Sequence, residues 1–138
     1  MYRSVVYTSS AIKGFSEEAL REVLAVSRRN NARDDVTGVL LFDSGSFLQV
    51  LEGEEKSLAR VLRRIKADTR HHGVQVLFDG VVPERSFGEW SMGCATIDEE
   101  GAFALTPEAM SRKLAIDTPP VIRVMVRTFF HVQRRYAA

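Results

Sequence analysis

The chain has 138 residues with 45% hydrophobic and 27% charged composition, so we expect one globular unit with a core of its own. A net charge of +1 gives no argument for a nucleic-acid partner, and a single cysteine, Cys94, excludes an intramolecular disulfide. The sequence contains neither a secretory signal nor an apolar run of about 18 residues that would span a membrane, so we expect a cytoplasmic location.

The first half of the chain predicts three strands and one helix. Residues 2–8 alternate in the manner of a strand. Ser16 is expected to cap a helix, because its hydroxyl can accept a hydrogen bond from a backbone N–H of the first turn. That helix is expected to close at residues 30–31. Residues 36–43 and 46–53 then predict two strands joined by a short turn.

The second half predicts a helix, two strands and a helical C-terminal segment. Apolar residues at helical spacing mark the helix, at Leu58, Val61, Leu62 and Ile65. Residues 74–82 and 88–97 are expected to be strands. Thr106-Pro107 and Thr118-Pro119 are typical of helix starts, and residues 121–136 predict an apolar helix with an arginine-containing polar stripe.

The predicted order is β-α-β-β-α-β-β, which is an α+β, ferredoxin-like arrangement with one additional strand. Right-handed crossovers would place both helices on one face of the sheet. The C-terminal helices are expected to cover the other face. We therefore expect one domain over residues 1–98 and a helical extension over residues 99–138 that packs on the sheet.

One residue does not fit the strand pattern of residues 46–53. Gln49 falls on the face that otherwise carries Phe47 and Leu51. A buried amide needs hydrogen-bond partners, since each unpaired polar group costs about 1–3 kcal/mol. In the predicted sheet the first and third strands are neighbours, so the Tyr7 side chain can come within reach of Gln49. The alternative is that Gln49 is solvated or bonded to backbone, and that Tyr7 is an ordinary core residue.

A group of charged residues lies on the second predicted helix, which we expect to continue through the adjacent histidines. It consists of Arg60, Arg63, Arg64, Lys66 and Arg70, with Asp68, His71 and His72 close by. Two interpretations remain open, a solvated helix face and an anchor for a phosphate or a ribityl chain. The adjacent histidines lack the further ligands of a metal site, so we expect no metal. No nucleophile with a base and no Gly-rich phosphate loop is present, so we do not expect an enzyme.

Four segments resemble the BLUF family, the blue-light sensors that use flavin. They are VVYTS near the start, RRNNARDDVTGVLLFDSGSFLQVLEGE in the middle, then DTRHH and FGEWSM. The resemblance runs from Tyr2 to about Ile97, with the motifs in order. It implies a noncovalent flavin, FAD or FMN, between the two helices.

The resemblance also implies roles for individual residues. Tyr7 matches the photoactive tyrosine, Gln49 matches the glutamine between it and the flavin, and Trp90 and Met92 match a pair on the last strand that responds to light. Implied flavin contacts are Ser27, Asn30, Asn31, Gln49, Arg64, Ile65, Asp68, Arg70 and His71.

A separate effector protein and a homodimer are the expected partners, with no direct contact to nucleic acid or membrane. A flavin-dependent redox enzyme and a flavin-free adaptor are the alternatives.

Overall fold

The computed structural model describes residues 1–43, 45–88, 93–96 and 119–136. Its elements, in chain order, are β1 (Tyr2–Ala11), α1 (Glu17–Arg33), β2 (Thr37–Asp43), β3 (Ser46–Gly53), α2 (Glu55–Ala67), β4 (His71–Val82), β5 (Gly93–Thr96) and α4 (Pro120–Tyr136). The predicted helix start at Thr106 and the predicted pair Trp90 and Met92 lie outside the described residues.

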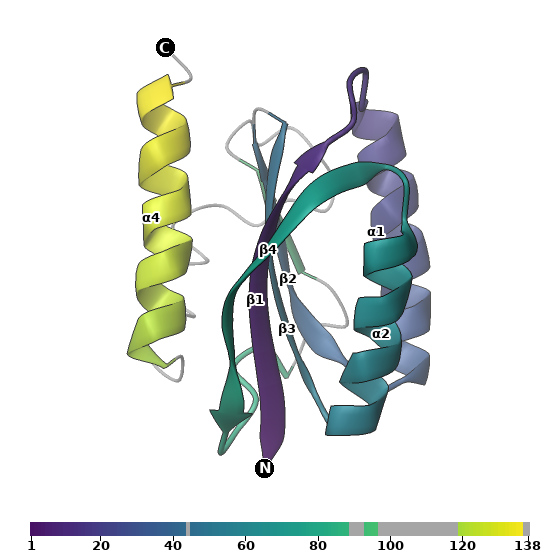
Figure 1. Ribbon diagram of the computed structural model, residues 1–138, viewed down its shortest axis with the longest axis vertical. Helices are drawn as coiled ribbons and strands as arrows, with labels where there is room; N and C mark the ends of the chain where they lie inside the picture. The colour runs from purple at the N-terminus through teal and green to yellow at the C-terminus, as the bar shows by residue number, and fades with distance from the viewer. Residues whose placement is uncertain (44, 89–92, 97–118, 137–138) are drawn as a thin grey trace.

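The strands form one five-stranded sheet in the order β4-β1-β3-β2-β5. Neighbouring strands are antiparallel except β2 and β5, which are parallel. Helices α1 and α2 lie on one face of the sheet, and α4 lies on the other (Figure 1). The ferredoxin-like α+β fold is confirmed, and α4 covers the second face as expected.

The first crossover is set by a local capping signal and by the strand register. The Ser16 hydroxyl accepts a hydrogen bond from the Ala19 backbone N–H at 3.0 Å, and Glu17 and Glu18 supply the acidic first turn that the helix dipole favours. Strand β1 then pairs with β3 so that Tyr7 stands opposite Gln49. The sheet therefore brings together the two residues that the sequence analysis singled out.

The alternation of β3 divides its side chains between two cores. On the side of α1 and α2, Phe47 and Leu51 pack with buried residues of both helices. On the side of α4, Leu48 and Val50 pack in a second cluster with Ile122 and other buried residues of α4. Both faces of this strand are buried, because each is covered by helices.

Gly38 on β2 shows how closely the central strands approach each other. A Cβ atom at this position would stand 2.0 Å from the carbonyl oxygen of Val50 on β3. Only glycine fits such a contact without moving the backbone. The chain turns between these two strands at Gly45, whose φ of +79° lies in the left-handed region that glycine tolerates.

Two predicted boundaries were wrong in an instructive way. Helix α2 ends at Ala67, and β4 begins at His71 rather than residue 74, so Arg70, His71 and His72 are not helical. The Asp68 carboxylate accepts a hydrogen bond from the Arg70 backbone N–H at 2.9 Å, which closes a turn there. His71 can then pair with Ala11 of β1.

The other boundaries differ by a few residues. Strand β1 continues to Ala11 through its pairing with β4, helix α1 continues to Arg33, and the last predicted strand is described only over Gly93–Thr96. Within the described parts of the chain, no helix is both long enough and apolar enough to cross a membrane.

Candidate functional site

A buried hydrogen bond between β1 and β3 lies at the centre of the site. The Tyr7 hydroxyl donates to Oε1 of Gln49, and both residues are buried. Burial, with a smaller contribution from the Asp68 carboxylate, raises the pKa of Tyr7 above its usual range. Tyr7 is therefore a neutral phenol with a proton to donate, and its acceptor is an amide that also carries donors.

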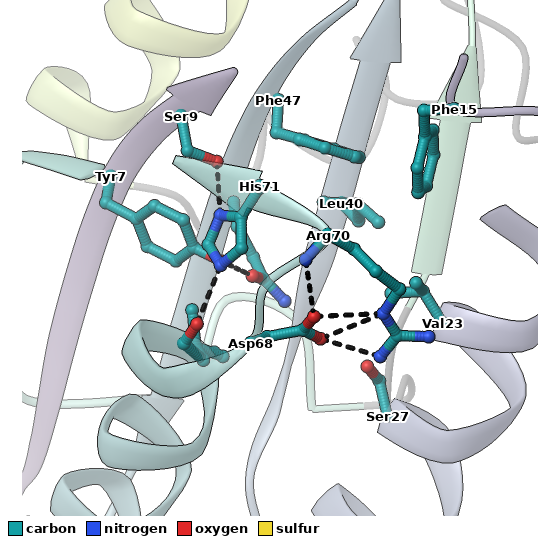
Figure 2. A pocket seen from close by; sticks show the side chains of 12 residues that line it. Tyr7, Ser9, Phe15, Val23, Ser27, Leu40, Phe47, Asp68, Arg70 and His71 are labelled. Carbon is teal, nitrogen blue, oxygen red and sulfur yellow. Dashed lines mark hydrogen bonds and ion pairs between the residues drawn. The ribbon is translucent and has the colours of Figure 1, made fainter. Parts of the chain in front are cut away.

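This pair borders a cavity under the gap between α1 and α2. Its wall combines apolar side chains and polar groups. The lining residues are Tyr7, Ser9, Phe15, Val23, Ser27, Leu40, Phe47, Gln49, Ile65, Asp68, Arg70 and His71. Figure 2 shows the aromatic rings of Phe15 and Phe47 apart from the charged pair, Asp68 and Arg70.

Asp68 and Arg70 form the charged end of the cavity. The Arg70 guanidinium donates to both carboxylate oxygens of Asp68 and reaches the Ser27 side of the cavity (Figure 2). This interaction with Arg70 is the main reason that the pKa of Asp68 is lowered, against the opposing effect of burial. The carboxylate is therefore charged at neutral pH and can accept hydrogen bonds from a ligand.

His71 ties the end of α2 to β1. Its Nε2 lies 2.6 Å from the carbonyl oxygen of Ile65, and its Nδ1 lies 2.8 Å from Oγ of Ser9. Because a carbonyl only accepts, Nε2 carries the proton in that contact, and the Ser9 hydroxyl is the hydrogen-bond partner of Nδ1. His71 is thus held in one orientation beside the cavity.

A second cavity continues the first toward the C-terminal ends of α1 and α2. It shares Gln49 and Asp68 with the first cavity and adds Asn30, Asn31 and Arg64. The two cavities together gather every residue predicted as a flavin contact, namely Ser27, Asn30, Asn31, Gln49, Arg64, Ile65, Asp68, Arg70 and His71.

Arg64 also borders an open hollow lined by arginines. The hollow is lined by one carboxylate, Asp34, and by the four cations Arg33, Arg60, Arg63 and Arg64, which leaves three net positive charges. Asp34 accepts a hydrogen bond from Arg64, which is the main cause of its lowered pKa, and Arg60 lies 3.7 Å from it. A phosphate would meet uncompensated positive charge here.

The apolar part of the lining was missed in the sequence analysis as a binding surface. Ser9 lies two residues after Tyr7, and Phe47 two residues before Gln49, so strand alternation alone could have placed both beside the central pair. Phe15 precedes α1 and contacts the ring of Phe47 at 5.4 Å between centroids. No comparable signal marks Phe15, because a loop residue carries no periodicity.

The donor set fits a flat heteroaromatic ring. Apolar side chains can cover its faces, while the amides of Gln49 and Asn31 and the carboxylate of Asp68 can meet polar atoms on its edge. A flavin ring has this chemistry, and the arginine-lined hollow suits its phosphates. The described residues contain no group of three or more side chains suited to a metal ion. The fold and cavity thus define a small ferredoxin-like domain that binds an organic cofactor.

Comparison with known proteins identifies the family. Residues 2–93 match the sequence profile of the BLUF family, described as sensors of blue light using FAD. The chain belongs to this family, and the resemblance drawn from the four segments is confirmed. It is a blue-light photoreceptor domain that uses a flavin.

Among curated proteins, the chain is 33% identical over 92 residues to the blue light- and temperature-regulated antirepressor BluF of Escherichia coli strain K12, covering 67% of this chain and 23% of that protein. It is 28% identical over 110 residues to the photoactivated adenylate cyclase subunit beta of Euglena longa, covering 79% of this chain and 13% of that protein. The chain thus spans less than a quarter of the length of these relatives.

Solved structures show the same fold in short and long proteins. BlrB, a BLUF protein in its dark state, superposes with a TM-score of 0.68 at 25% identity, covering 83% of this chain and 95% of that one. A bacterial light-regulated adenylyl cyclase gives a TM-score of 0.72 at 28% identity, covering 99% of this chain but 36% of that one.

Proposed function

We propose that the paired cavities bind FAD noncovalently and that Tyr7 and Gln49 form the light-operated switch. The hydrogen bond from the buried Tyr7 hydroxyl to Gln49 Oε1, at the wall of the cavity, carries this proposal. The nine predicted contact residues line the same space.

The preference for FAD over FMN rests on the arginine-lined hollow. Arg64 borders both the second cavity and this hollow, so a cofactor that passes Arg64 enters a region with three net positive charges. The diphosphate of FAD carries more negative charge into that region than one phosphate placed near Arg64. The attraction is screened by salt because the arginines are largely exposed.

The residues of the switch act through one proton and one amide. A bound flavin supplies the absorption of blue light and, once excited, an acceptor for an electron. Tyr7 would give an electron and its hydroxyl proton to the bound flavin, and its hydrogen bond to Gln49 would then be broken. Gln49 then reorients, because its side chain carries an acceptor at one end and a donor at the other. When the electron and the proton return to Tyr7, Gln49 would present the other end of its amide to the flavin. The resulting hydrogen bond from Gln49 would shift the flavin absorption slightly to the red.

Asn31 and His71 hold the surroundings of the switch fixed. Asn31 is buried at the wall of the second cavity, and His71 is fixed by contacts to Ser9 and Ile65. With its neighbours fixed, Gln49 has two discrete hydrogen-bonded arrangements rather than a continuum. Such a two-state element is what a light signal needs in order to persist in darkness.

The output is proposed to reach a separate effector protein in the cytoplasm, with the sensor as a homodimer. The chain covers 95% of BlrB, a solved BLUF protein. The relatives with cyclase or antirepressor names show that BLUF domains serve different outputs.

The proposal is tested by absorption spectra of the purified protein in darkness and under blue light. A flavin spectrum that shifts to the red and recovers in darkness is expected. Denaturation should release the chromophore into solution, where chromatography separates FAD from FMN. Bleaching without a shift would contradict the switch, and protein that stays colourless after added flavin would contradict the site.

Gln49→Leu is the decisive variant, because it conserves volume and removes the amide. It should bind flavin and show no lasting red shift. Gln75→Leu on the exposed edge strand β4 is the matched control and should behave as the wild type. A normal red shift in Gln49→Leu would overturn the assignment of the switch.

A further inference from the structure

A second buried polar centre lies on the other face of the sheet. Glu52 of β3 follows Gln49 by three residues, so its side chain points toward α4 rather than toward the cavity. Glu52 is 1% exposed, and it stands opposite Ser4 in the pairing of β1 with β3. A carboxylate buried this deeply requires hydrogen-bond partners, and the partners of Glu52 connect β3 to the segment that follows β4.

The Glu52 carboxylate fastens the segment after β4 to the sheet. It accepts hydrogen bonds from the backbone N–H groups of Ser86 at 2.8 Å and Phe87 at 2.6 Å. It also accepts one from the Thr37 hydroxyl of β2 at 3.0 Å. These bonds lower the pKa of Glu52 while burial, the larger effect, raises it. One side chain therefore joins β2, β3 and residues 83–88.

Arg85 fastens the same segment on its exposed side. Its guanidinium donates to the Thr37 hydroxyl at 3.1 Å and to the backbone carbonyl of Asp35 at 2.8 Å, and it lies 4.7 Å from the centre of the Tyr2 ring. The segment is thus held at successive residues, and it has little freedom to move independently of β3.

Phe87 carries this connection to α4. Its ring is 0% exposed and belongs to the core cluster that contains Ile122, Val126 and Phe129 of α4. The backbone N–H of Phe87 is bonded to Glu52 while its ring packs under α4. A displacement of β3 near Glu52 would therefore reach α4 through Phe87, in addition to the direct packing of Leu48 and Val50 in the same cluster.

Ser4 provides a second arrangement for the carboxylate. Its side chain is 0% exposed, and within the described part of the chain its hydroxyl has no hydrogen-bond partner. Because Ser4 and Glu52 are directly opposite each other, their Cβ atoms are about 4.5–5.5 Å apart. A shifted carboxylate can accept a bond from Ser4 in exchange for one of its present bonds.

We propose that Glu52 is the positioning residue that transmits the light-induced change in β3 to α4. In the lit state its carboxylate gives up a hydrogen bond from the backbone of residues 86–87 and accepts one from the Ser4 hydroxyl instead. The inference rests on the proposed Tyr7–Gln49 switch, which acts on β3 from the opposite face. It predicts that the output can be separated from the photochemistry, because Glu52 does not line either cavity.

The test compares Glu52→Gln with the exposed control Glu55→Gln in flavin-loaded protein. Two readouts are taken in darkness and in light, the flavin absorption and the amide hydrogen exchange of residues 85–88 and 121–129. In the wild type, light should change exchange in α4. In Glu52→Gln the red shift should remain while the light-induced change in α4 disappears.

A charged acceptor is lost in Glu52→Gln, so the Ser86 and Phe87 amides should also exchange about fivefold faster in darkness. A role in stability alone would lower the melting temperature in both light states and leave the light response of α4 intact. An unchanged light response in Glu52→Gln overturns the proposal, as does a wild type that shows a red shift without any change in α4.

Ser4→Ala keeps the proposal testable if Glu52→Gln does not bind flavin. Removing an unpartnered hydroxyl should leave folding and the red shift intact, whereas it should weaken the light-induced change in α4. A full α4 response in Ser4→Ala would overturn the exchange of bonds. Absence of a red shift in the wild type would instead contradict the proposed function, so the two failures are distinguishable.

Discussion

Tyr7→Phe separates the photochemical role of one hydroxyl from its structural role. The variant keeps the ring in a site that is 3% exposed, so no cavity larger than a hydroxyl is formed. It removes the hydrogen bond to Gln49 Oε1 and leaves that buried oxygen without this donor. The expected cost is about 1–3 kcal/mol of unfolding free energy. For 138 residues this corresponds to a melting temperature lower by about 3–10 °C.

The assay measures thermal unfolding and light-induced absorption on the same samples. Both are recorded with the same excess of flavin, because a ligand that binds only the folded state adds to the apparent stability. Tyr7→Phe should bind flavin and show no lasting red shift, because the phenol proton is gone.

Tyr2→Phe on the same strand is the matched control. The Tyr2 ring lies against Arg85 and lines neither cavity. This variant should change stability by less than about 0.5 kcal/mol and keep the red shift. A normal photocycle in Tyr7→Phe would refute the role of the phenol. Equal stability of Tyr7→Phe and Tyr2→Phe would refute the reasoning about the buried hydrogen bond.

Two further predictions concern the α4 side of the sheet and the charged end of the cavity. Ile122→Ala removes a side chain that is 0% exposed, so urea unfolding should show a free energy of unfolding lower by about 2–5 kcal/mol. The control Val124→Ala changes a residue that is 62% exposed and should lower it by less than about 0.5 kcal/mol. Equal losses would mean that α4 does not pack on the sheet. The lowered pKa of Asp68 stabilises the fold above the usual aspartate range, and this stability is lost as pH falls through the lowered value. Asp68→Asn should therefore narrow the difference between melting temperatures at neutral and acid pH, whereas an undiminished difference would contradict the effect assigned to Arg70.

Much of the fold could be predicted because its signals are local. The alternation in β3 correctly divided Phe47 and Leu51 from Leu48 and Val50. Ser16 caps α1 as expected, through a bond that spans three residues. The proximity of Tyr7 to Gln49 was also predicted, because the split βαβ order places their strands side by side, whereas their direct pairing across the strands came from the structure. The roles predicted for Trp90 and Met92 stay predictions, since both residues lie outside the described part of the chain.

The errors occurred where a side chain interrupts a local pattern. Helical periodicity gave no reason to end α2 at Ala67, because the turn depends on the Asp68 carboxylate bonding to the Arg70 backbone. The same turn moved His71 from a helix to the start of β4, where contacts to Ser9 and Ile65 orient it. Charge patterning placed these residues near the site but did not determine which way they face.

The sequence by itself determined the order of strands and helices, the two faces of β3 and the family, because periodicity, capping and motif spacing are properties of neighbouring residues. Only the tertiary structure decided the closing of Tyr7 onto Gln49, the joining of the two cavities at Asp68, and the fastening of residues 86–87 by Glu52. Glu52 appears in the sequence as one more polar position on a strand. The backbone groups of Ser86 and Phe87 that it binds are 34 and 35 residues away along the chain, and no local pattern encodes a contact of that kind.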